Sequence, residues 1–266
     1  MPATRESLVR PGRVLLAVAM LVFGVQYFLY GRFVGGVPPV PASEPGNPPW
    51  AYLAGIALIA AGLGIAIRKT ARASAMLLGM LFFLCVAFLH LPALASHVSD
   101  PVRWTRAFEP LAICGAAWVL AGVLPSRFLS AVPPLVFGVQ HFMYGTFVGS
   151  LVPGWIPGHL FLAYFTGAAF IAAAISIALD VRATLAASLG AMFLLWALIL
   201  HLPWVAAAPG NEDEWTGVFV ALAMGGAAFI VAGNLAGTPG RRFLRRTQGE
   251  RDLAVEYEGL WAGSGR

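Results

Sequence analysis

Side chains that can donate hydrogen bonds or carry a proton lie within two matching apolar stretches of this chain. Residues 23–35 read FGVQYFLYGRFVG and residues 137–149 read FGVQHFMYGTFVG, and ten of these thirteen positions are identical. A second motif, Leu-His-Leu-Pro, occurs once in each half of the chain. The candidate ligand-binding residues are Gln26, Tyr27, Tyr30, Gln140, His141 and Tyr144 from the first motif, and His90 and His201 from the second.

The elements that carry these residues are long hydrophobic runs. Of the 266 residues, 59% are hydrophobic and 11% are charged, which is about half the charged fraction of a soluble domain. Runs of this length indicate transmembrane helices, because irregular backbone in lipid would leave its polar groups unpaired. The sequence therefore predicts an all-α membrane protein with eight transmembrane helices, over residues 14–33, 51–67, 73–94, 108–124, 130–149, 158–179, 183–205 and 216–236.

An internal repeat extends beyond the first motif. The third span recurs as LGMLFFLCVAFLHLP (78–92) and LGAMFLLWALILHLP (189–203). The fourth recurs as WTRAFEPLAICGAAWVLAG (104–122) and WTGVFVALAMGGAAFIVAG (215–233). Because each unit has an even number of spans, the two units enter the membrane from the same side, as parallel four-helix repeats. We expect a first repeat over residues 1–127, a second over 128–236, and a basic cytoplasmic tail over 237–266.

The distribution of basic residues predicts the orientation of the spans. Only Arg32, Arg103 and Arg106 fall in the expected outer segments, whereas the other fourteen of the seventeen Lys and Arg residues fall in the inner segments or the tail. This bias predicts that both termini lie in the cytoplasm. The net charge of +5 is therefore explained by membrane orientation and anionic lipid, and we expect no nucleic-acid partner.

Helical geometry places the polar residues toward the outer ends of their spans. Gly138, His141, Gly145 and Gly149 share one helical face, whose small residues allow a neighbouring helix to approach closely. We therefore expect His141 to point into the bundle, in a polar pocket at the depth of a quinone headgroup. The alternative is an interfacial belt of aromatic residues, with glutamine bonding across helices.

Several kinds of site are disfavoured by what the sequence lacks. Cys85 and Cys114 lie in apolar runs without metal-ligand spacing, and a site built from the histidines would need three separate helices to converge, so we predict no metal. Asp180 and Glu109 fall near the edges of their spans rather than at mid-membrane, which counts against an ion-coupled transporter. The chain also contains no phosphate-binding loop and no dinucleotide-binding fingerprint.

The stretch over residues 138–179 resembles the DoxX-like membrane proteins, which are four-helix units whose first helix ends in His-Phe. A Pro-x-Trp-x-Pro loop and a second helix with Tyr-x-x-Gly follow in that family. The matching residues are His141, Phe142, Phe147, Pro153, Trp155, Pro157, Tyr164 and Gly167. The resemblance implies a bacterial inner membrane and, in some members, a membrane subunit of a thiosulfate:quinone oxidoreductase. Many members have a glutamate after the helix-2 glycine, where this chain has Ala168, Ala169 and Phe170.

Three functions follow as hypotheses. The first is a quinone-interacting membrane subunit of a redox system, with Gln140, His141 and Tyr144 as headgroup ligands, His90 or His201 as proton carriers, and a soluble or membrane-bound redox partner. The second is a non-catalytic assembly or stress-response scaffold whose outer face binds another protein. The third is a small-solute transporter. Whether the chain is itself an enzyme stays open at this point.

Overall fold

The computed structural model describes residues 5–34, 48–123 and 126–237, and within these residues the chain is helical without strands. Each of the eight expected spans overlaps one or more helical segments, while the basic tail from residue 238 onward lies outside the described residues. The helices are α1 (Arg5–Tyr30), α2 (Pro48–Ala66), α3 (Ala71–Cys85), α4 (Leu91–Ala95), α5 (Pro101–Ala121), α6 (Ser126–Met143), α7 (Gly145–Ser150), α8 (His159–Ala178), α9 (Ala183–Trp196), α10 (Leu202–Ala207) and α11 (Glu212–Ala236), with π-helical segments η1 (Val86–His90) and η2 (Ala197–His201).

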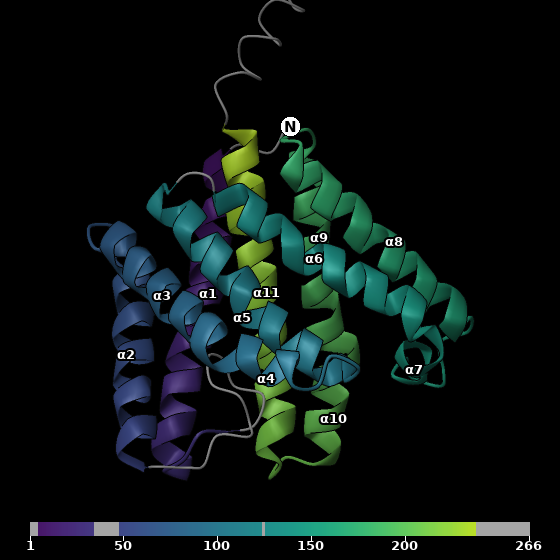
Figure 1. Ribbon diagram of the computed structural model, residues 1–266, viewed down its shortest axis with the longest axis horizontal. Helices are drawn as coiled ribbons and strands as arrows, with labels where there is room; N and C mark the ends of the chain where they lie inside the picture. The colour runs from purple at the N-terminus through teal and green to yellow at the C-terminus, as the bar shows by residue number, and fades with distance from the viewer. Residues whose placement is uncertain (1–4, 35–47, 124–125, 238–266) are drawn as a thin grey trace, which may run out of the picture.

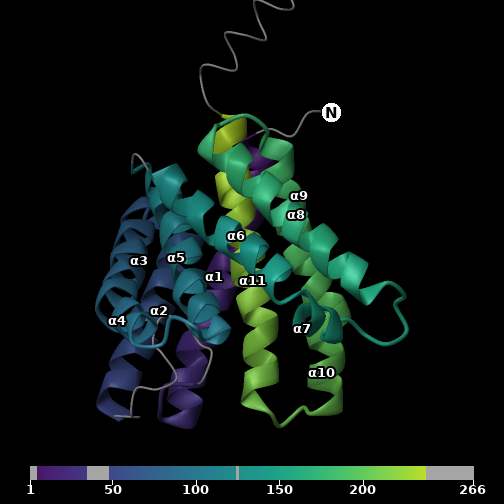
Figure 2. The same ribbon diagram turned by 45° about the vertical axis from the view of Figure 1, so that its right-hand side comes forward.

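The helices form one bundle in which the two ends of the described chain lie together (Figure 1). Helices α1 and α11 run side by side at its centre, α2 and α3 lie on one flank, and α8 and α9 lie on the other (Figures 1 and 2). Within the first half, α1 packs on α2 and α3 packs on α5. Within the second half, α6 packs on α8 and α9 packs on α11. Between the halves, α1 packs on α11, α6 packs on α5, and α5 packs on α11.

Six helical segments of the described chain are long and apolar enough to cross a membrane: residues 5–30, 48–66, 71–95, 159–178, 183–207 and 212–236. Two of the eight expected spans are not among them. The apolar part of α6, Phe128–Met143, is shorter than the others, and Arg106 and Glu109 lower the hydropathy of α5. The chain is therefore a multi-pass membrane protein by length and composition, with six segments that meet both criteria.

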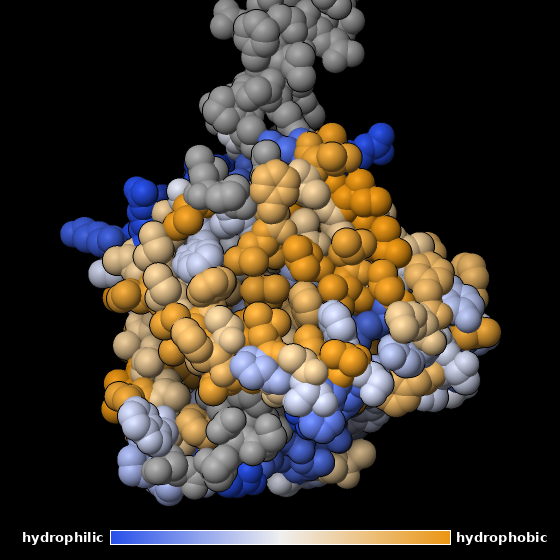
Figure 3. Space-filling model, viewed as in Figure 1, coloured by the Kyte–Doolittle hydropathy of each residue, from blue (hydrophilic) through white to orange (hydrophobic). Residues whose placement is uncertain are grey.

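The surface of the bundle is suited to lipid. Large apolar side chains such as Leu29, Leu77 and Phe88 are exposed along the helices. Figure 3 shows apolar residues across the middle of one face, with hydrophilic residues gathered above and below them. A soluble protein rarely exposes an apolar area of this extent, because its contact with water is unfavourable. This surface agrees with a bilayer environment.

Close helix packing depends on glycines at matching positions in the two halves. A Cβ on Gly24 would lie 2.7 Å from the carbonyl oxygen of Gly55 on α2, and a Cβ on Gly138 would lie 2.8 Å from that of Gly167 on α8. Any side chain at these positions would therefore push the helices apart. The predicted small-residue face of the fifth span does contact a neighbouring helix, because Gly145 and Gly149 also lie against α8.

Arginines at the end of the bundle that holds the termini bind the C-terminal carbonyls of two helices. The Arg13 guanidinium donates to the Ile65 and Ala66 oxygens of α2 at 2.8 and 3.1 Å. Arg72 donates to the Ala121 oxygen of α5 at 2.9 Å. The last carbonyls of a helix have no intrahelical partner and carry partial negative charge, so a cation stabilises them. These arginines therefore have a structural role beyond orientation.

Candidate functional site

The two glutamines of the repeated motif each pair with a threonine at the start of a neighbouring helix. Gln140 on α6 donates to the Pro101 carbonyl oxygen at 2.9 Å. Its Oε1 accepts from the hydroxyl of Thr105 on α5 at 3.3 Å, and this hydroxyl shares its hydrogen with the Pro101 oxygen, also at 3.3 Å. Gln26 on α1 donates to Thr216 of α11 at 3.0 Å. Both bonds join one half of the chain to the other. The interpretation of glutamine as a bond across helices is therefore confirmed for both residues.

The two glutamines differ in how completely they are paired. Both polar groups of the Gln140 amide have partners, whereas Gln26 Oε1 is buried without a hydrogen-bond partner. Thr216 does not complete the pair, because its hydroxyl donates to the Glu212 carbonyl oxygen. An unpaired buried acceptor costs free energy, so Gln26 is the less favourable of the two.

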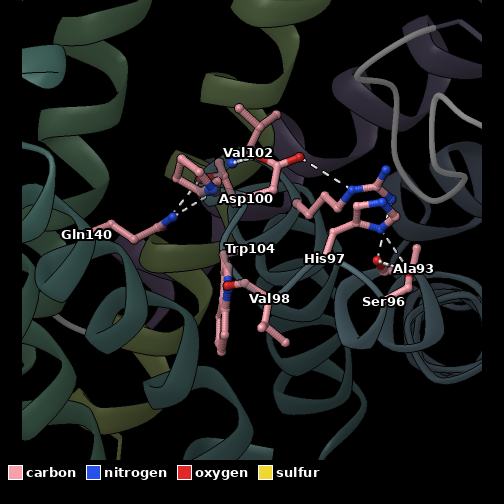
Figure 4. A network of polar contacts seen from close by, with 11 residues as sticks. Ala93, Ser96, His97, Val98, Asp100, Val102, Trp104 and Gln140 are labelled. Carbon is pink, nitrogen blue, oxygen red and sulfur yellow. Dashed lines mark hydrogen bonds and ion pairs between the residues drawn. The ribbon is translucent and has the colours of Figure 1, made fainter.

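A polar network surrounds the Gln140 contact at the start of α5 (Figure 4). Asp100 caps this helix by accepting from the Val102 backbone N–H at 2.9 Å, and it pairs with Arg103 at 3.3 Å. The Trp104 indole N–H donates to the Val98 carbonyl oxygen at 2.8 Å.

The start of α11 repeats this pattern 111 residues later. Asn211 caps the helix by accepting from the Asp213 N–H at 3.0 Å, and Trp215 donates to the Pro209 oxygen at 3.0 Å. Both tryptophans therefore close a loop locally, with the indole N–H bonded to a carbonyl oxygen six residues earlier.

His141 points into the bundle, between α8 and α9. Its Nδ1 lies 2.7 Å from the Phe137 carbonyl oxygen, one turn earlier in the same helix. Its ring lies 5.2 Å from that of Phe170 and 6.3 Å from that of Trp196, whose plane is nearly parallel at 12°. The residue is half-buried, so part of it stays accessible. Gln140 and His141 therefore face different neighbours, α5 and α8–α9.

The equivalent position in the first half is closed. Tyr27 is fully buried and meets Phe33 edge to face at 5.3 Å. Phe23, Leu58 and Phe82, which correspond to Phe137, Phe170 and Phe193, are also fully buried. Only the second half leaves a polar ring partly accessible at this site.

The remaining predicted residues lie at the margins of these two sites. Tyr30 is exposed at the end of α1, and Tyr144 lies at the bend between α6 and α7. His90 is buried at the end of η1, and His201 is half-buried at the end of η2, where its ring contacts Gly217 and meets Trp204 edge to face. The structure therefore does not bring the eight predicted residues into one cluster.

A cavity of about 30 Å³ lies between α5, α6, α8, α9 and α11, next to the His141 site. Phe137, Phe170 and Phe193 line it, and Ser130 contributes a hydroxyl. A space of this size holds about one water molecule and is far smaller than a site for a ring ligand. The wall of this cavity contains none of the eight predicted residues.

Sequence reasoning missed the aromatic partners of His141. Phe170 and Trp196 lie next to its ring. The sequence signal for them was a difference between the two copies, because the first copy has Leu58 and Cys85 at the corresponding positions. Among the described residues no group of three His, Cys, Asp or Glu side chains could hold a metal ion, and the two cysteines are free thiols.

Comparisons with known proteins give no match: no protein-family model matches the chain, and neither a curated protein nor a solved structure matches it. The resemblance to DoxX-like proteins therefore depends on the motifs around His141 alone.

Proposed function

We propose that this chain is a multi-pass membrane protein of the DoxX-like type whose second half binds a quinone or quinol ring beside His141. The observation that carries the proposal is the setting of this histidine. It is a titratable ring within a transmembrane bundle, bounded by two aromatic side chains and still partly accessible. Ionisable residues inside membrane proteins are costly to bury and usually mark a ligand or proton site.

The hydrogen bond of His141 determines what its other ring nitrogen can do. A carbonyl oxygen only accepts, so Nδ1 carries the hydrogen that it donates to Phe137. No hydrogen bond joins Nε2 to another described residue, and His141 as a whole is half-buried. In the neutral ring it accepts a hydrogen bond from a quinol hydroxyl, and in the protonated ring it donates one to a quinone carbonyl. The electrons would pass to or from a separate redox partner.

The difference between the halves favours a single site. Tyr27 and its neighbours fill the first copy completely, whereas His141 in the second copy is only half-buried. Trp196 and Phe170 offer the flat apolar surfaces against which a quinone ring packs. Gln140 belongs to the α5 contact instead, so we assign it to structure rather than to the ligand.

The proposal includes eight spans arranged as two parallel repeats, with both termini in the cytoplasm of a bacterial cell and the spans in its inner membrane. The matching packing of the two halves supports this arrangement, since α1, α2, α3 and α5 pack on one another and on the other half as α6, α8, α9 and α11 do. Arg10, Arg68 and Arg72 lie with the termini at one end of the bundle, as the positive-inside rule requires.

The test is the quinone content and quinone affinity of the purified full-length protein. We expect wild-type protein to retain quinone through detergent extraction, or to bind added ubiquinone saturably. His141→Phe keeps an aromatic ring but loses the hydrogen bond, so it should weaken binding by about 2- to 12-fold. His97→Ala, in an exposed loop outside the site, is the matched control and should bind as wild type does. Folded wild-type protein that neither carries nor binds quinone would refute the proposal.

A further inference from the structure

The connection between α6 and α8 differs from the other links at its end of the bundle because it carries no charge. From Phe128 to Leu179 the chain contains no Asp, Glu, Lys or Arg. The loop before α5 carries Asp100, and α11 begins with Glu212, Asp213 and Glu214. Charged residues of this kind keep a loop in water, because their burial in lipid is unfavourable. No such residue occurs over these 52 successive positions, so no charged side chain keeps this connection in water.

The same connection presents large apolar side chains on its surface. Phe147 in α7 is 61% exposed, Trp155 in the following loop is 75% exposed, and Phe161 at the start of α8 is 69% exposed. Phe161 belongs to a helix that is long and apolar enough to span a membrane. The exposed apolar surface of the connection is therefore continuous with that of α8.

Part of the backbone of the connection is paired within the connection itself. Hydrogen bonds within the segment pair the N–H groups of Val148, Leu151, Val152 and Ile156 with carbonyls three or four residues earlier. Such pairing is a requirement for backbone in a bilayer. The segment is anchored to α8, because Gly145 lies against the ring of Tyr164 and that ring stacks on Phe142 at 5.6 Å.

We propose that α7 and residues 151–158 are embedded in the lipid leaflet opposite the termini, at the boundary between headgroups and acyl chains. The partner of this surface is the bilayer itself, which Trp and Phe side chains prefer at that depth. The embedded segment begins four residues after His141. That site therefore adjoins lipid rather than water, and a lipid-soluble ligand reaches it from the bilayer. The placement of the segment does not depend on what the site binds.

Two glycines provide a matched pair for the test. A Cβ added at Gly154, in the proposed embedded loop, or at Gly210, in the loop before α11, would meet nothing within 4 Å, so each accepts a side chain. Gly154→Cys and Gly210→Cys are each made in full-length protein with Cys85→Ala and Cys114→Ala. Each is then labelled with a nitroxide and reconstituted into phosphatidylcholine–phosphatidylglycerol liposomes.

Power-saturation EPR compares collisions with oxygen, which concentrates in lipid, and with a nickel chelate, which stays in water. We expect the ratio of oxygen to nickel accessibility to exceed one at 154 and to fall below one at 210. Nickel accessibility at 154 as high as at 210 would overturn the proposal. So would exclusion of both reagents at 154, since a second protein surface would then cover the loop.

A second measurement avoids new cysteines. Brominated phosphatidylcholine quenches tryptophan only at lipid depth, so wild-type protein should lose more fluorescence in such liposomes than Trp155→Phe does. Equal absolute losses of fluorescence from the two proteins would contradict the embedded position of this loop, because Trp155 would then not be quenched.

Discussion

Replacing each of the two repeated glutamines by leucine should have opposite effects on stability. Leucine has a similar size but no polar atoms, so the change isolates the hydrogen bonding of the amide. Gln140 has two paired groups, at 2.9 Å to Pro101 and 3.3 Å to Thr105. Gln26 has one bond, at 3.0 Å to Thr216, and one buried acceptor without a partner.

The structure gives the expected magnitudes. Gln140→Leu removes the bond to Pro101, worth about 0.5 to 1.5 kcal/mol, and a shared bond from Thr105, which keeps the Pro101 oxygen as its partner, so it should lower the free energy of unfolding by about 1 to 2 kcal/mol. Gln26→Leu loses one such bond but relieves an unpaired acceptor that costs about 1 to 3 kcal/mol, so it should raise this free energy by about 1 kcal/mol. Thr216 keeps its bond to the Glu212 oxygen at 2.9 Å after this change. The two variants should therefore differ by about 2 to 3 kcal/mol.

Reversible unfolding of the purified protein by sodium dodecyl sulfate in mixed micelles, followed by circular dichroism, measures both changes under one condition. The double variant should show additive effects, because the two glutamines lie on different helix pairs. Equal destabilisation by Gln26→Leu and Gln140→Leu would refute the reasoning, since it would mean that the Oε1 atom of Gln26 has a partner in the membrane.

Two further substitutions test the packing and the helix ends in the same unfolding assay. Gly138→Ala places a Cβ 2.8 Å from the Gly167 carbonyl oxygen and should destabilise the α6–α8 pair by about 1 to 3 kcal/mol. Gly154→Ala is the control, because its Cβ meets open space. Equal effects of the two substitutions would contradict the close approach of α6 and α8. Arg13→Gln removes charged hydrogen bonds to the last carbonyls of α2 and should lower the free energy of unfolding by about 1.5 to 3 kcal/mol. Arg10→Gln, at an exposed ion pair, should lower it by less than about 1 kcal/mol. The reverse order would contradict the capping role of Arg13.

Much of the fold could be predicted from the sequence because hydrophobic length and glycine spacing are local properties. The eight expected spans overlap helical segments, and the face with Gly138 and Gly145 contacts α8 as expected. The fifth span was predicted as one helix over 130–149, but the structure divides it at Tyr144, with α7 continuing in another direction (Figure 2). The Tyr144 backbone N–H still donates to the Gln140 backbone carbonyl oxygen at 2.8 Å, so the helix bends at Tyr144 rather than ending there.

The candidate site was harder to predict, because adjacent residues on a helix face different neighbours. Gln140 and His141 were expected to share one ligand, yet one contacts α5 and the other contacts Phe170 and Trp196. Neither aromatic residue has a distinctive spacing in the sequence. A residue pattern gives the face of one helix, but the side chains that meet it come from elsewhere in the chain.

The sequence by itself determined that this chain forms apolar helices, that its two halves share motifs, and that Gln26 and Gln140 occupy equivalent positions. Only the tertiary structure decided which threonine each glutamine binds. Thr105 and Thr216 lie in the same repeated motif, so local chemistry gives neither glutamine a preference. The choice is made by the packing of α1 on α11 and of α6 on α5, which depends on contacts between residues far apart in the chain. Such contacts are summed over whole helix surfaces, and no short motif encodes them.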